Sequence, residues 1–530
     1  MTQKTYASPS GVLSPRDRPP LPDAFLRRLR RDFGEAADAL LESLTRPPVL
    51  SLRANPLKID RAELAVRLGR AYHLPPQAFE PVPWSDEGLY FPRTIEPGKH
   101  PYHAAGLYYI QEASAMAPVF LLDPGPDERI LDLAAAPGGK TTQIAARLTD
   151  GGFVLANDID PGRASAIIEN VDRLGLPNVL VTVLNPRKLA EMLPGFFDRV
   201  LVDAPCSSEG LFRKKPEAIS HWSEAAVDRA ARLQAELLDL AVELVKPGGT
   251  IVYSTCTWNR LENEETVERF LSRHPDIALH PPTEDEAARL VGADFTPFGV
   301  RLLPHRARGE GHFIARFRRT QDADGRLSAA PGMGTDMPAE RFRPVFPLAR
   351  PLERRSPSPA KKAARQRALS PPDATIVQLL KRFFDDALPE SPLRPDDSGR
   401  VAITRGGMTL IWDPPHVEAL PATLVAAALH TLPLRLRGLR LGEMRNGRFL
   451  PSHALALAHR PHELTGGRLV PLDLSAAERY LRGETLERPG TPDGYALAVL
   501  DGFPLGWVKA TGGTLKNHYP KGLRRNVGKP

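Results

Sequence analysis

The chain contains only two cysteines in 530 residues, Cys206 and Cys256. Two thiols cannot form the disulfide framework of a small secreted domain, and they cannot complete a four-sulfur zinc site. The first 20 residues are polar and contain prolines, so they lack the apolar core of a signal peptide. No apolar stretch is long enough to span a bilayer. We therefore expect a cytoplasmic protein without a membrane partner.

The chain has no large excess of one charge, since its net charge is +7. This basic balance is compatible with a polyanionic partner, but charge alone does not identify one. The apolar fraction of 42% is ordinary for a globular protein, and 530 residues are enough for two or three domains. The 55 prolines predict frequent linkers and rigid turns.

Four regions differ in their residue pattern. Residues 1–100 combine a predicted helix with short strands, which indicates a small α/β lobe that we expect to contact RNA. Residues 101–320 alternate apolar strands with helices. Residues 321–373 are rich in Pro, Ser, Ala and Arg and predict a linker. Residues 374–530 contain short strands separated by glycines and form the last predicted domain.

The region 101–320 has the pattern of repeated βα units. Its predicted strands are continuously apolar, as expected for strands buried on both faces, and lie at 130–134, 153–156, 179–183, 199–203 and 250–254. Helices are expected between them, including a long one at 224–245. The pattern predicts an α/β fold with a doubly wound, mainly parallel sheet.

The predicted linker is strongly basic. From Arg341 to Arg367 it carries nine Lys or Arg residues against one acid, Glu353. A solvated flexible tether explains this composition, and so does direct contact with RNA. The residues alone do not decide between these two interpretations.

A glycine-containing turn follows the first strand of the predicted sheet, in the run Asp132-Leu-Ala-Ala-Ala-Pro-Gly-Gly-Lys-Thr141. It is not a Walker A loop, because Ala134 stands where that loop needs glycine, and the G-x-G-x-x-G fingerprint is absent. A Gly138-Gly139 turn at a helix start lets backbone N–H groups approach a ligand closely. A plain strand-to-helix turn is the alternative.

An acidic residue, Asp158, ends the second predicted strand about 20 residues after the glycine turn. An acid at this place in a doubly wound sheet can accept hydrogen bonds from a ribose. It can also simply cap the helix that follows.

The two cysteines follow the fourth and fifth predicted strands, in Asp203-Ala-Pro-Cys206 and Ser254-Thr-Cys256-Thr. These strands are expected as neighbours, so their carboxyl ends would place both sulfurs at one rim. Buried inert cysteine is the common alternative. A reducing cytoplasm disfavours a disulfide between them, and two cysteines without a neighbouring histidine make a poor metal site. We expect one pocket with two sulfur roles and no metal.

These motifs resemble the RNA cytosine-C5 methyltransferases of the ribosomal small-subunit methyltransferase B/F and Sun family. The resemblance covers roughly residues 22–318 and includes Tyr109-Ile-Gln-Glu-Ala-Ser-Ala-Met, Tyr253-Ser-Thr-Cys-Thr and Glu262-Asn-Glu. The segment from Cys206 through Trp222 is most similar to the F branch, which modifies 16S rRNA. Residues 509–525 resemble, more loosely, the PUA-like region of that branch. The resemblance implies a Rossmann-like class I methyltransferase with a C-terminal PUA-like α+β domain.

The resemblance further implies S-adenosyl-L-methionine as methyl donor. Asp158 would bind its ribose, and Asp203 would lie between donor and base. The family usually has an acid near the adenine, where this chain has Asn185, whose carbonyl could still accept from the adenine amino group. The turn residues implied to hold the cofactor are Ala134, Ala135, Ala136, Pro137, Gly138, Gly139 and Lys140.

The same family assigns chemistry to four side chains. Cys256 is implied as the nucleophile that adds to C6 of cytosine, and Cys206 as the residue that assists release. Asp203, if protonated or sharing a proton with the base, would stabilise charge at N3 and N4. Lys140 would polarise the base carbonyl and help to ionise the thiol; a solvated helix-start lysine is its alternative.

The expected partner is RNA, either 16S rRNA or the small ribosomal subunit, bound by a monomer. DNA is not expected, because DNA cytosine methyltransferases have only the Pro-Cys cysteine. Methylation of tRNA and a non-catalytic role as an RNA-binding assembly factor are the alternatives.

The end of the chain is basic, and no acid follows Asp501. We expect it to contact RNA phosphates, with His518 and Tyr519 available for stacking. A solvated basic tail is the alternative. The basic residues of this segment are Lys509, Lys516, Lys521, Arg524, Arg525 and Lys529.

Overall fold

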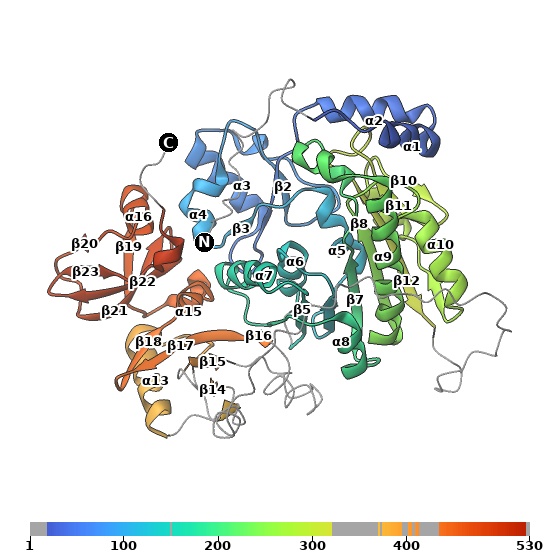
Figure 1. Ribbon diagram of the computed structural model, residues 1–530. Helices are drawn as coiled ribbons and strands as arrows, with labels where there is room; N and C mark the ends of the chain where they lie inside the picture. The colour runs from blue at the N-terminus through green and yellow to red at the C-terminus, as the bar shows by residue number, and fades with distance from the viewer. Residues whose placement is uncertain are drawn as a thin grey trace.

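The computed structural model describes residues 19–148, 151–320, 369–370, 374–394, 401–404, 409–412 and 434–525. The basic stretch from Arg341 to Arg367, and Lys529, lie outside the described residues. Within these ranges, no helix is both long enough and apolar enough to cross a membrane. The N-terminal and central parts of the chain form one body, against which the C-terminal part packs (Figure 1).

A ten-stranded sheet forms the centre of the molecule, in the order β10-β11-β12-β8-β7-β4-β5-β6-β16, with β9 paired to β12. Its middle consists of the five predicted strands, all parallel to one another. Their bounds are β4 Arg129–Asp132, β5 Phe153–Asn157, β6 Val179–Thr182, β7 Phe197–Asp203 and β8 Val245–Thr255. The expected doubly wound α/β arrangement is therefore confirmed.

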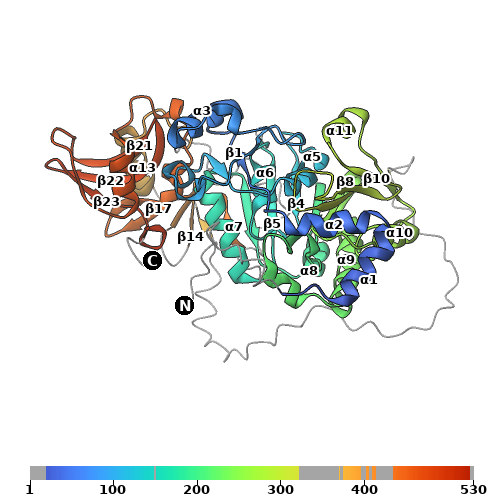
Figure 2. The same ribbon diagram turned by 90° about the horizontal axis from the view of Figure 1, so that it is seen from above.

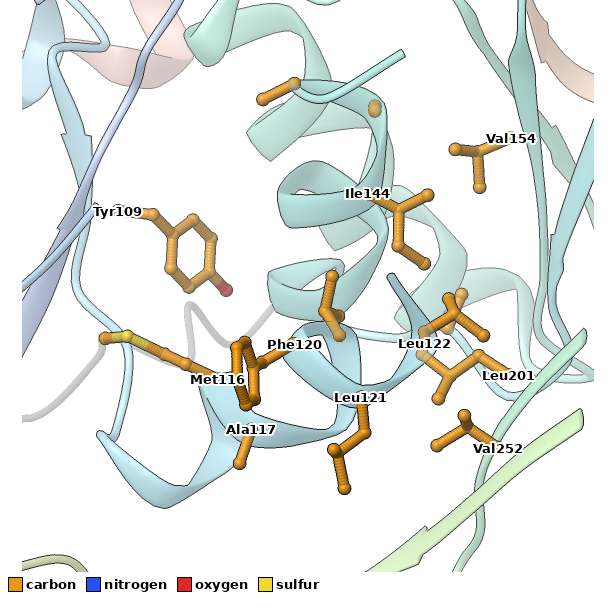
Figure 3. Close-up of a cluster of buried hydrophobic side chains, with 14 of the residues drawn as sticks. Tyr109, Met116, Ala117, Phe120, Leu121, Leu122, Ile144, Val154, Leu201 and Val252 are labelled. Carbon is orange, nitrogen blue, oxygen red and sulfur yellow. The ribbon is translucent and has the colours of Figure 1, made fainter. Parts of the chain in front are cut away.

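Alternate residues of a strand point to opposite faces of the sheet. Both faces are apolar here, and helices cover both of them. Leu201 and Val252 belong to one buried cluster (Figure 3), whereas Val200 and Ile251 belong to the other. The first cluster is closed by α5 Ala117–Leu122, α6 Gly139–Ala145 and α7 Pro161–Leu174. The second is closed by α8 Pro186–Met192, α9 Glu224–Leu244 and α10 Glu264–Arg273.

The sheet continues beyond its parallel centre on both sides. Antiparallel strands extend it past β8, namely β12 His312–Arg319, β11 Gly299–Leu302, β10 Asp294–Thr296 and β9 Ile277–Leu279. On the other side β16 Leu434–Arg437 pairs antiparallel with β6. A strand from the C-terminal region thus completes the edge of the central sheet.

The N-terminal lobe has two parts that pack in different places (Figure 2). Helices α1 Asp23–Phe33 and α2 Ala36–Thr45 pack with Phe212 and Trp222 of the central region. A three-stranded antiparallel sheet and α3 Arg61–Tyr72 form the other part. The strands of that sheet are β1 Ser51–Ala54, β2 Gly88–Tyr90 and β3 Tyr108–Tyr109.

The C-terminal region contains two five-stranded sheets rather than one domain core. The first sheet has the order β13-β14-β15-β17-β18, and its first strand, Leu369–Ser370, lies within the stretch predicted as a linker. Its other strands are β14 Val401–Thr404, β15 Thr409–Trp412, β17 Leu439–Arg445 and β18 Arg448–Pro451, and α13 Ala374–Ala387 packs against it.

The second C-terminal sheet has the order β19-β21-β22-β23-β20 and packs with α16 Leu474–Leu481. Its strands are β19 Leu469–Leu472, β20 Leu486–Glu487, β21 Gly494–Leu500, β22 Phe503–Thr511 and β23 Thr514–Asn517. It shares a buried cluster with the N-terminal lobe, including Leu52 on one side and Leu505 on the other. Tyr102 donates a 2.5 Å hydrogen bond to Asp501 across this contact.

Candidate active site

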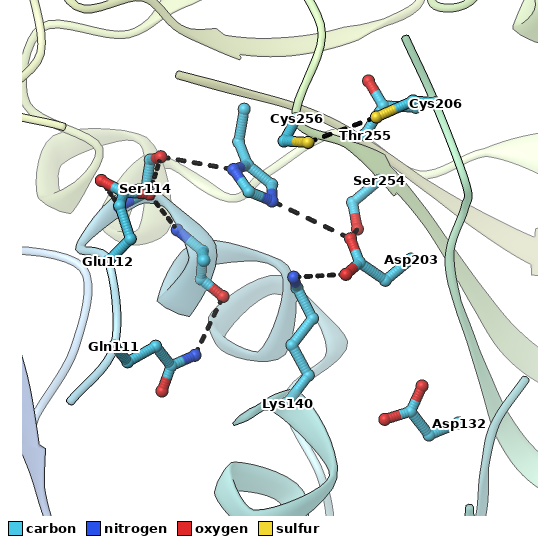
Figure 4. A network of polar contacts seen from close by, with 12 residues as sticks. Gln111, Glu112, Ser114, Asp132, Lys140, Asp203, Cys206, Ser254, Thr255 and Cys256 are labelled. Carbon is cyan, nitrogen blue, oxygen red and sulfur yellow. Dashed lines mark hydrogen bonds and ion pairs between the residues drawn. The ribbon is translucent and has the colours of Figure 1, made fainter. Parts of the chain in front are cut away.

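The two cysteines lie side by side at the carboxyl edge of the central sheet. Strands β7 and β8 are parallel, with Asp203 opposite Ser254, so the loops that follow them leave the sheet together. The Cys206 and Cys256 sulfurs are 3.2 Å apart, and both thiols are free (Figure 4). The pairing of neighbouring parallel strands thus brings together two residues that are 50 positions apart.

Two buried carboxylates fasten the cysteine loops to each other. Glu262, on the Cys256 side, accepts hydrogen bonds from the Ser207 backbone N–H at 3.0 Å and from the Asn259 side chain at 2.7 Å. Glu209, on the Cys206 side, accepts from the backbone N–H groups of Trp258 and Asn259 at 2.8 and 3.0 Å. Each loop therefore supplies a carboxylate that holds the other loop, which fixes the position of both sulfurs.

The environment of Cys206 disfavours its thiolate form. The hydrogen bond with Cys256, followed by burial, raises the pKa of Cys206 well above its usual value. When Glu262 is ionised, its negative charge acts in the same direction. Cys206 therefore stays protonated, and its S–H can donate to the neighbouring sulfur when that sulfur carries negative charge.

An ion pair lies beside the cysteines. The Lys140 Nζ is 2.6 Å from Asp203 Oδ2, and the Ser254 hydroxyl donates to Asp203 Oδ1 at 2.7 Å. Burial opposes ionisation of Asp203, but the attraction of the Lys140 ammonium and the hydrogen bonds to this carboxyl outweigh it and hold its pKa well below its usual range. Asp203 is therefore ionised here, rather than protonated. Lys140 is 9% exposed, which rules out the alternative of a solvated helix-start lysine.

The glycine turn requires a glycine at position 138. Gly138 has φ of +101°, and a Cβ there would lie 3.2 Å from the Ile167 Cα. A Cβ on Gly139 would make only an ordinary contact with the Tyr109 ring, at 3.4 Å. The buried Arg53 of the N-terminal lobe donates to the Gly139 carbonyl at 3.2 Å and to Thr142 Oγ1 at 2.8 Å. Arg53, from another lobe, thus holds the turn in place. No motif in the sequence identifies this residue.

Asp132 leaves an unpaired acceptor beside this turn. Its Oδ2 accepts from the Thr141 hydroxyl at 2.6 Å, whereas its Oδ1 is buried and has no hydrogen-bond partner within the described residues. Burial raises the pKa of Asp132 to about 7. An ammonium group, such as that of a methionyl ligand, would supply the missing donor.

Asp158 directly follows β5, which is the place expected for a residue that binds the ribose, and it is 3% exposed. Its Oδ2 accepts from the Ala136 N–H at 3.4 Å and forms an ion pair with Arg163 at 3.3 Å. It does not cap α7, because Asp160 accepts the hydrogen bonds of that helix start. The capping alternative for Asp158 is therefore wrong.

Asn185 has a different role in the structure from the expected one. It is the N-cap of α8, and its side-chain carbonyl accepts from the Arg187 N–H at 2.9 Å. The oxygen that was expected to accept from adenine is thus already engaged in the helix cap, although a carbonyl has a second lone pair.

The structure adds a histidine that sequence reasoning missed. His312, at the start of β12, is 5% exposed, and its Nε2 lies 3.8 Å from Asp203 Oδ1. No histidine adjoins either cysteine in the sequence, and only the antiparallel pairing of β12 with β8 brings this one near. In the part of the chain that the structure describes, no group of three His, Cys, Asp or Glu residues could hold a metal ion.

The basic residues and aromatic rings at the C-terminus agree only in part with the RNA contacts expected of them. Arg525 donates to the backbone carbonyls of Lys99 and His100, so it anchors the C-terminal domain to the N-terminal lobe. Tyr519 is 6% exposed and packs against His453, which leaves its ring unavailable for stacking on a base. Lys516 and Lys521 are exposed.

This arrangement on a doubly wound sheet defines a class of protein, the Rossmann-like methyltransferases that use S-adenosyl-L-methionine. The unpaired Asp132 oxygen, the two-glycine turn and buried Asp158 fit that cofactor. Three family models match the chain: 16S rRNA methyltransferase RsmB/F over residues 119–318, the N-terminal domain of 16S rRNA methyltransferase RsmF over 21–113, and the methyltransferase RsmF PUA domain over 468–525.

Curated relatives match almost the whole chain. Ribosomal RNA small subunit methyltransferase F of Klebsiella pneumoniae (strain 342) is 32% identical over 524 residues, covering 95% of this chain and 97% of its own. The protein of the same name from Escherichia coli O7:K1 is 31% identical over 530 residues, with the same coverage. The chain belongs to the ribosomal RNA small subunit methyltransferase F family.

Among solved structures, the crystal structure of PH0851 is 30% identical, with a TM-score of 0.52, and covers 56% of this chain and 66% of its own. The family models confirm the PUA domain predicted at the C-terminus, and they place it on the second of the two C-terminal sheets. The first sheet lies before that match.

Proposed function

We propose that the protein transfers a methyl group from S-adenosyl-L-methionine to C5 of a cytosine in 16S rRNA, through a covalent bond between Cys256 Sγ and C6. The observation that carries this proposal is the contact of two free thiols, 3.2 Å apart, beside an ionised aspartate paired with a buried lysine. Membership of a family named for the small-subunit rRNA supports the substrate.

The chemistry requires a thiol nucleophile because C5 of cytosine is itself a weak one. Addition of the Cys256 thiolate to C6 pushes the C5–C6 π electrons toward C5, which makes C5 nucleophilic. Residues 134–140 and Asp158 would hold the cofactor, which would supply an electrophilic methyl group. Cys206 keeps its proton and can donate a hydrogen bond to the Cys256 sulfur, which stabilises the thiolate before addition and again when it leaves.

The ion pair would orient the base and balance its charge. Asp203 is ionised, so it can accept a hydrogen bond from the exocyclic N4 amino group. Lys140 can donate to the carbonyl or ring nitrogen on which negative charge develops after addition. The base must leave its stack to reach these groups. Asn185 remains a candidate for the adenine contact, through its free lone pair.

The two alternatives predict different outcomes. A non-catalytic assembly factor would not need the juxtaposition of Cys206, Cys256, Asp203 and Lys140, whose contacts are all present. A tRNA methyltransferase would use the same site on another RNA.

Bisulfite sequencing of 16S rRNA and tRNA from a deletion strain tests the proposal. We expect one or more 16S cytosines to lose protection from conversion, and plasmid-borne wild-type protein to restore it. A Cys256→Ala plasmid should not restore it. Loss of the mark from tRNA alone would overturn the rRNA assignment, and an unchanged pattern in both RNAs would overturn the activity.

A further inference from the structure

His312 begins β12, beside the end of the strand that Cys256 directly follows. Strand β12 runs antiparallel to β8, with Phe313 opposite Thr255. Continuing this register by one residue brings His312 opposite Cys256, and directly opposite residues of an antiparallel pair project from the same face. The backbones do converge there, because a Cβ on Gly210 would lie 2.7 Å from the Cys256 carbonyl and 3.2 Å from that of Gly311.

The hydrogen bonds around Ser114 determine which ring nitrogen of His312 carries a proton. The Ser114 hydroxyl donates to Glu112 Oε2 (Figure 4), and a hydroxyl has only one proton to give. Its oxygen therefore accepts from the Gly311 N–H at 3.2 Å and from His312 Nδ1 at 3.3 Å. Nδ1 is thus the protonated nitrogen of a neutral His312, and Nε2 holds a lone pair.

The Nε2 atom of His312 is poised to receive a proton. It is buried and has no hydrogen-bond partner among the described residues. It lies 3.8 Å from Asp203 Oδ1, a distance at which a protonated ring would form an ion pair. A proton accepted at Nε2 would therefore face the Asp203 carboxylate.

On the basis of the function proposed above, we propose that His312 accepts the proton that leaves C5 after methyl transfer. The C5–H bond breaks, and the proton goes to His312 Nε2. The C–H electron pair forms the C5–C6 double bond, and the C6–S bond breaks with its electrons on Cys256 Sγ. The products are 5-methylcytosine, a Cys256 thiolate and an imidazolium paired with Asp203. Cys206 then acts as hydrogen-bond donor to the departing sulfur, and not as the base.

The test separates methyl transfer from proton release. RNA carrying cytosine tritiated at C5 is incubated with cofactor labelled with ¹⁴C in its methyl group. In His312→Asn the amide nitrogen can replace Nδ1 as donor to Ser114, but no basic nitrogen faces Asp203. We expect tritium release to fall by about 100-fold or more, within the usual range for a lost general base. The ¹⁴C label should accumulate in RNA covalently bound to the protein.

The control is His280→Asn, which alters an exposed histidine and should leave both labels unchanged. Added imidazole should restore tritium release to His312→Gly but not to Cys206→Ala. Measurements of cofactor affinity and of thermal unfolding show whether each variant is folded. If a His312 variant is not folded, His312→Gln is tested in its place.

Three results would overturn the role of His312. These are normal tritium release by His312→Asn, a parallel loss of both labels without an adduct in the folded variant, and failure of imidazole to rescue. Failure of the proposed function itself looks different, because the wild-type protein would then release no tritium and form no Cys256-dependent adduct.

Discussion

The Glu262 carboxylate accepts a hydrogen bond from the backbone N–H of Ser207 at 3.0 Å, although the two residues follow different strands of the sheet. Gln234 of α9 donates to the same carboxylate oxygen at 2.8 Å. Burial raises the pKa of Glu262 to about 7, and the charge of Glu209 adds to the effect. The positioning of the sulfurs therefore depends on a carboxyl group that titrates near neutral pH.

This raised pKa predicts a pH dependence of stability. In the folded protein Glu262 keeps its proton up to a pH of about 7, whereas in the unfolded chain it loses the proton near 4.5. The folded state thus binds more protons between these values, so the free energy of unfolding should fall as pH rises from about 4.5 to 7. Glu262→Gln should flatten this slope, because it removes the titration.

Denaturant unfolding at several pH values between 4.5 and 8 checks this expectation. Asp132 contributes a slope of the same sign, so Glu262→Gln should reduce the dependence without abolishing it. Glu268→Gln, at an exposed position of α10, is the matched control and should leave the slope unchanged. An identical slope in Glu262→Gln and wild type would contradict the raised pKa.

The parallel centre of the fold could be predicted because its strands are buried on both faces and read as continuous apolar runs. The antiparallel part could not, because β12 carries Arg316 and Arg318 among its apolar residues. Arg316 is buried with its guanidinium paired to Glu286 and hydrogen-bonded to backbone carbonyls from other segments. The pairing of β16 with β6 joins segments some 250 residues apart, which no local pattern encodes.

The residues of the site also differ in whether the sequence could predict their position. Lys140 and Asp203 stand in motifs that a resemblance can locate, and the structure pairs them. Arg53 and His312 reach the site only through tertiary packing, the first from another lobe and the second through strand register. At the C-terminus, charge predicted phosphate contacts, but the packing of Arg525 against backbone carbonyls could not be read from composition.

Cys256→Ala should abolish methylation while leaving S-adenosyl-L-methionine binding nearly intact. The sulfur is required only for the bond to C6, and the groups that fit the cofactor, including Asp132 and Asp158, lie on β4 and after β5. Methyl incorporation into rRNA and isothermal titration with the cofactor measure the two properties separately. Retained turnover would refute Cys256 as the nucleophile, and lost cofactor binding would indicate a disturbed fold.

Cys206→Ala should accumulate a covalent RNA–protein adduct. Without the thiol 3.2 Å from Cys256, the departing sulfur loses its hydrogen-bond donor, so elimination slows more than addition. A denaturing gel with substrate RNA should show a slowly migrating band, absent from the Cys206→Ala/Cys256→Ala double variant. A band that persists in the double variant would mean that the roles of the two cysteines are reversed or wrong.

The exposed lysines of the PUA domain should contribute to RNA affinity through phosphate contacts. Lys516 lies on β23 and Lys521 four residues after that strand ends, and both are exposed. Lys516→Gln/Lys521→Gln should weaken RNA binding and reduce the slope of log affinity against log salt by about 1 for each lost contact. Turnover at saturating RNA should change far less, because these residues lie outside the catalytic site.

Arg525→Gln should behave differently from the lysine variants. Its guanidinium holds the C-terminal domain to the N-terminal lobe through backbone carbonyls, so its loss should lower thermal stability rather than act only on the salt slope. Lys188→Gln, an exposed position on α8, provides the charge-matched control for binding. Filter binding of 16S rRNA fragments between 50 and about 200 mM salt, the range over which phosphate contacts show their effect, measures the slopes. If the double lysine variant keeps the wild-type slope and affinity, Lys516 and Lys521 do not contact RNA.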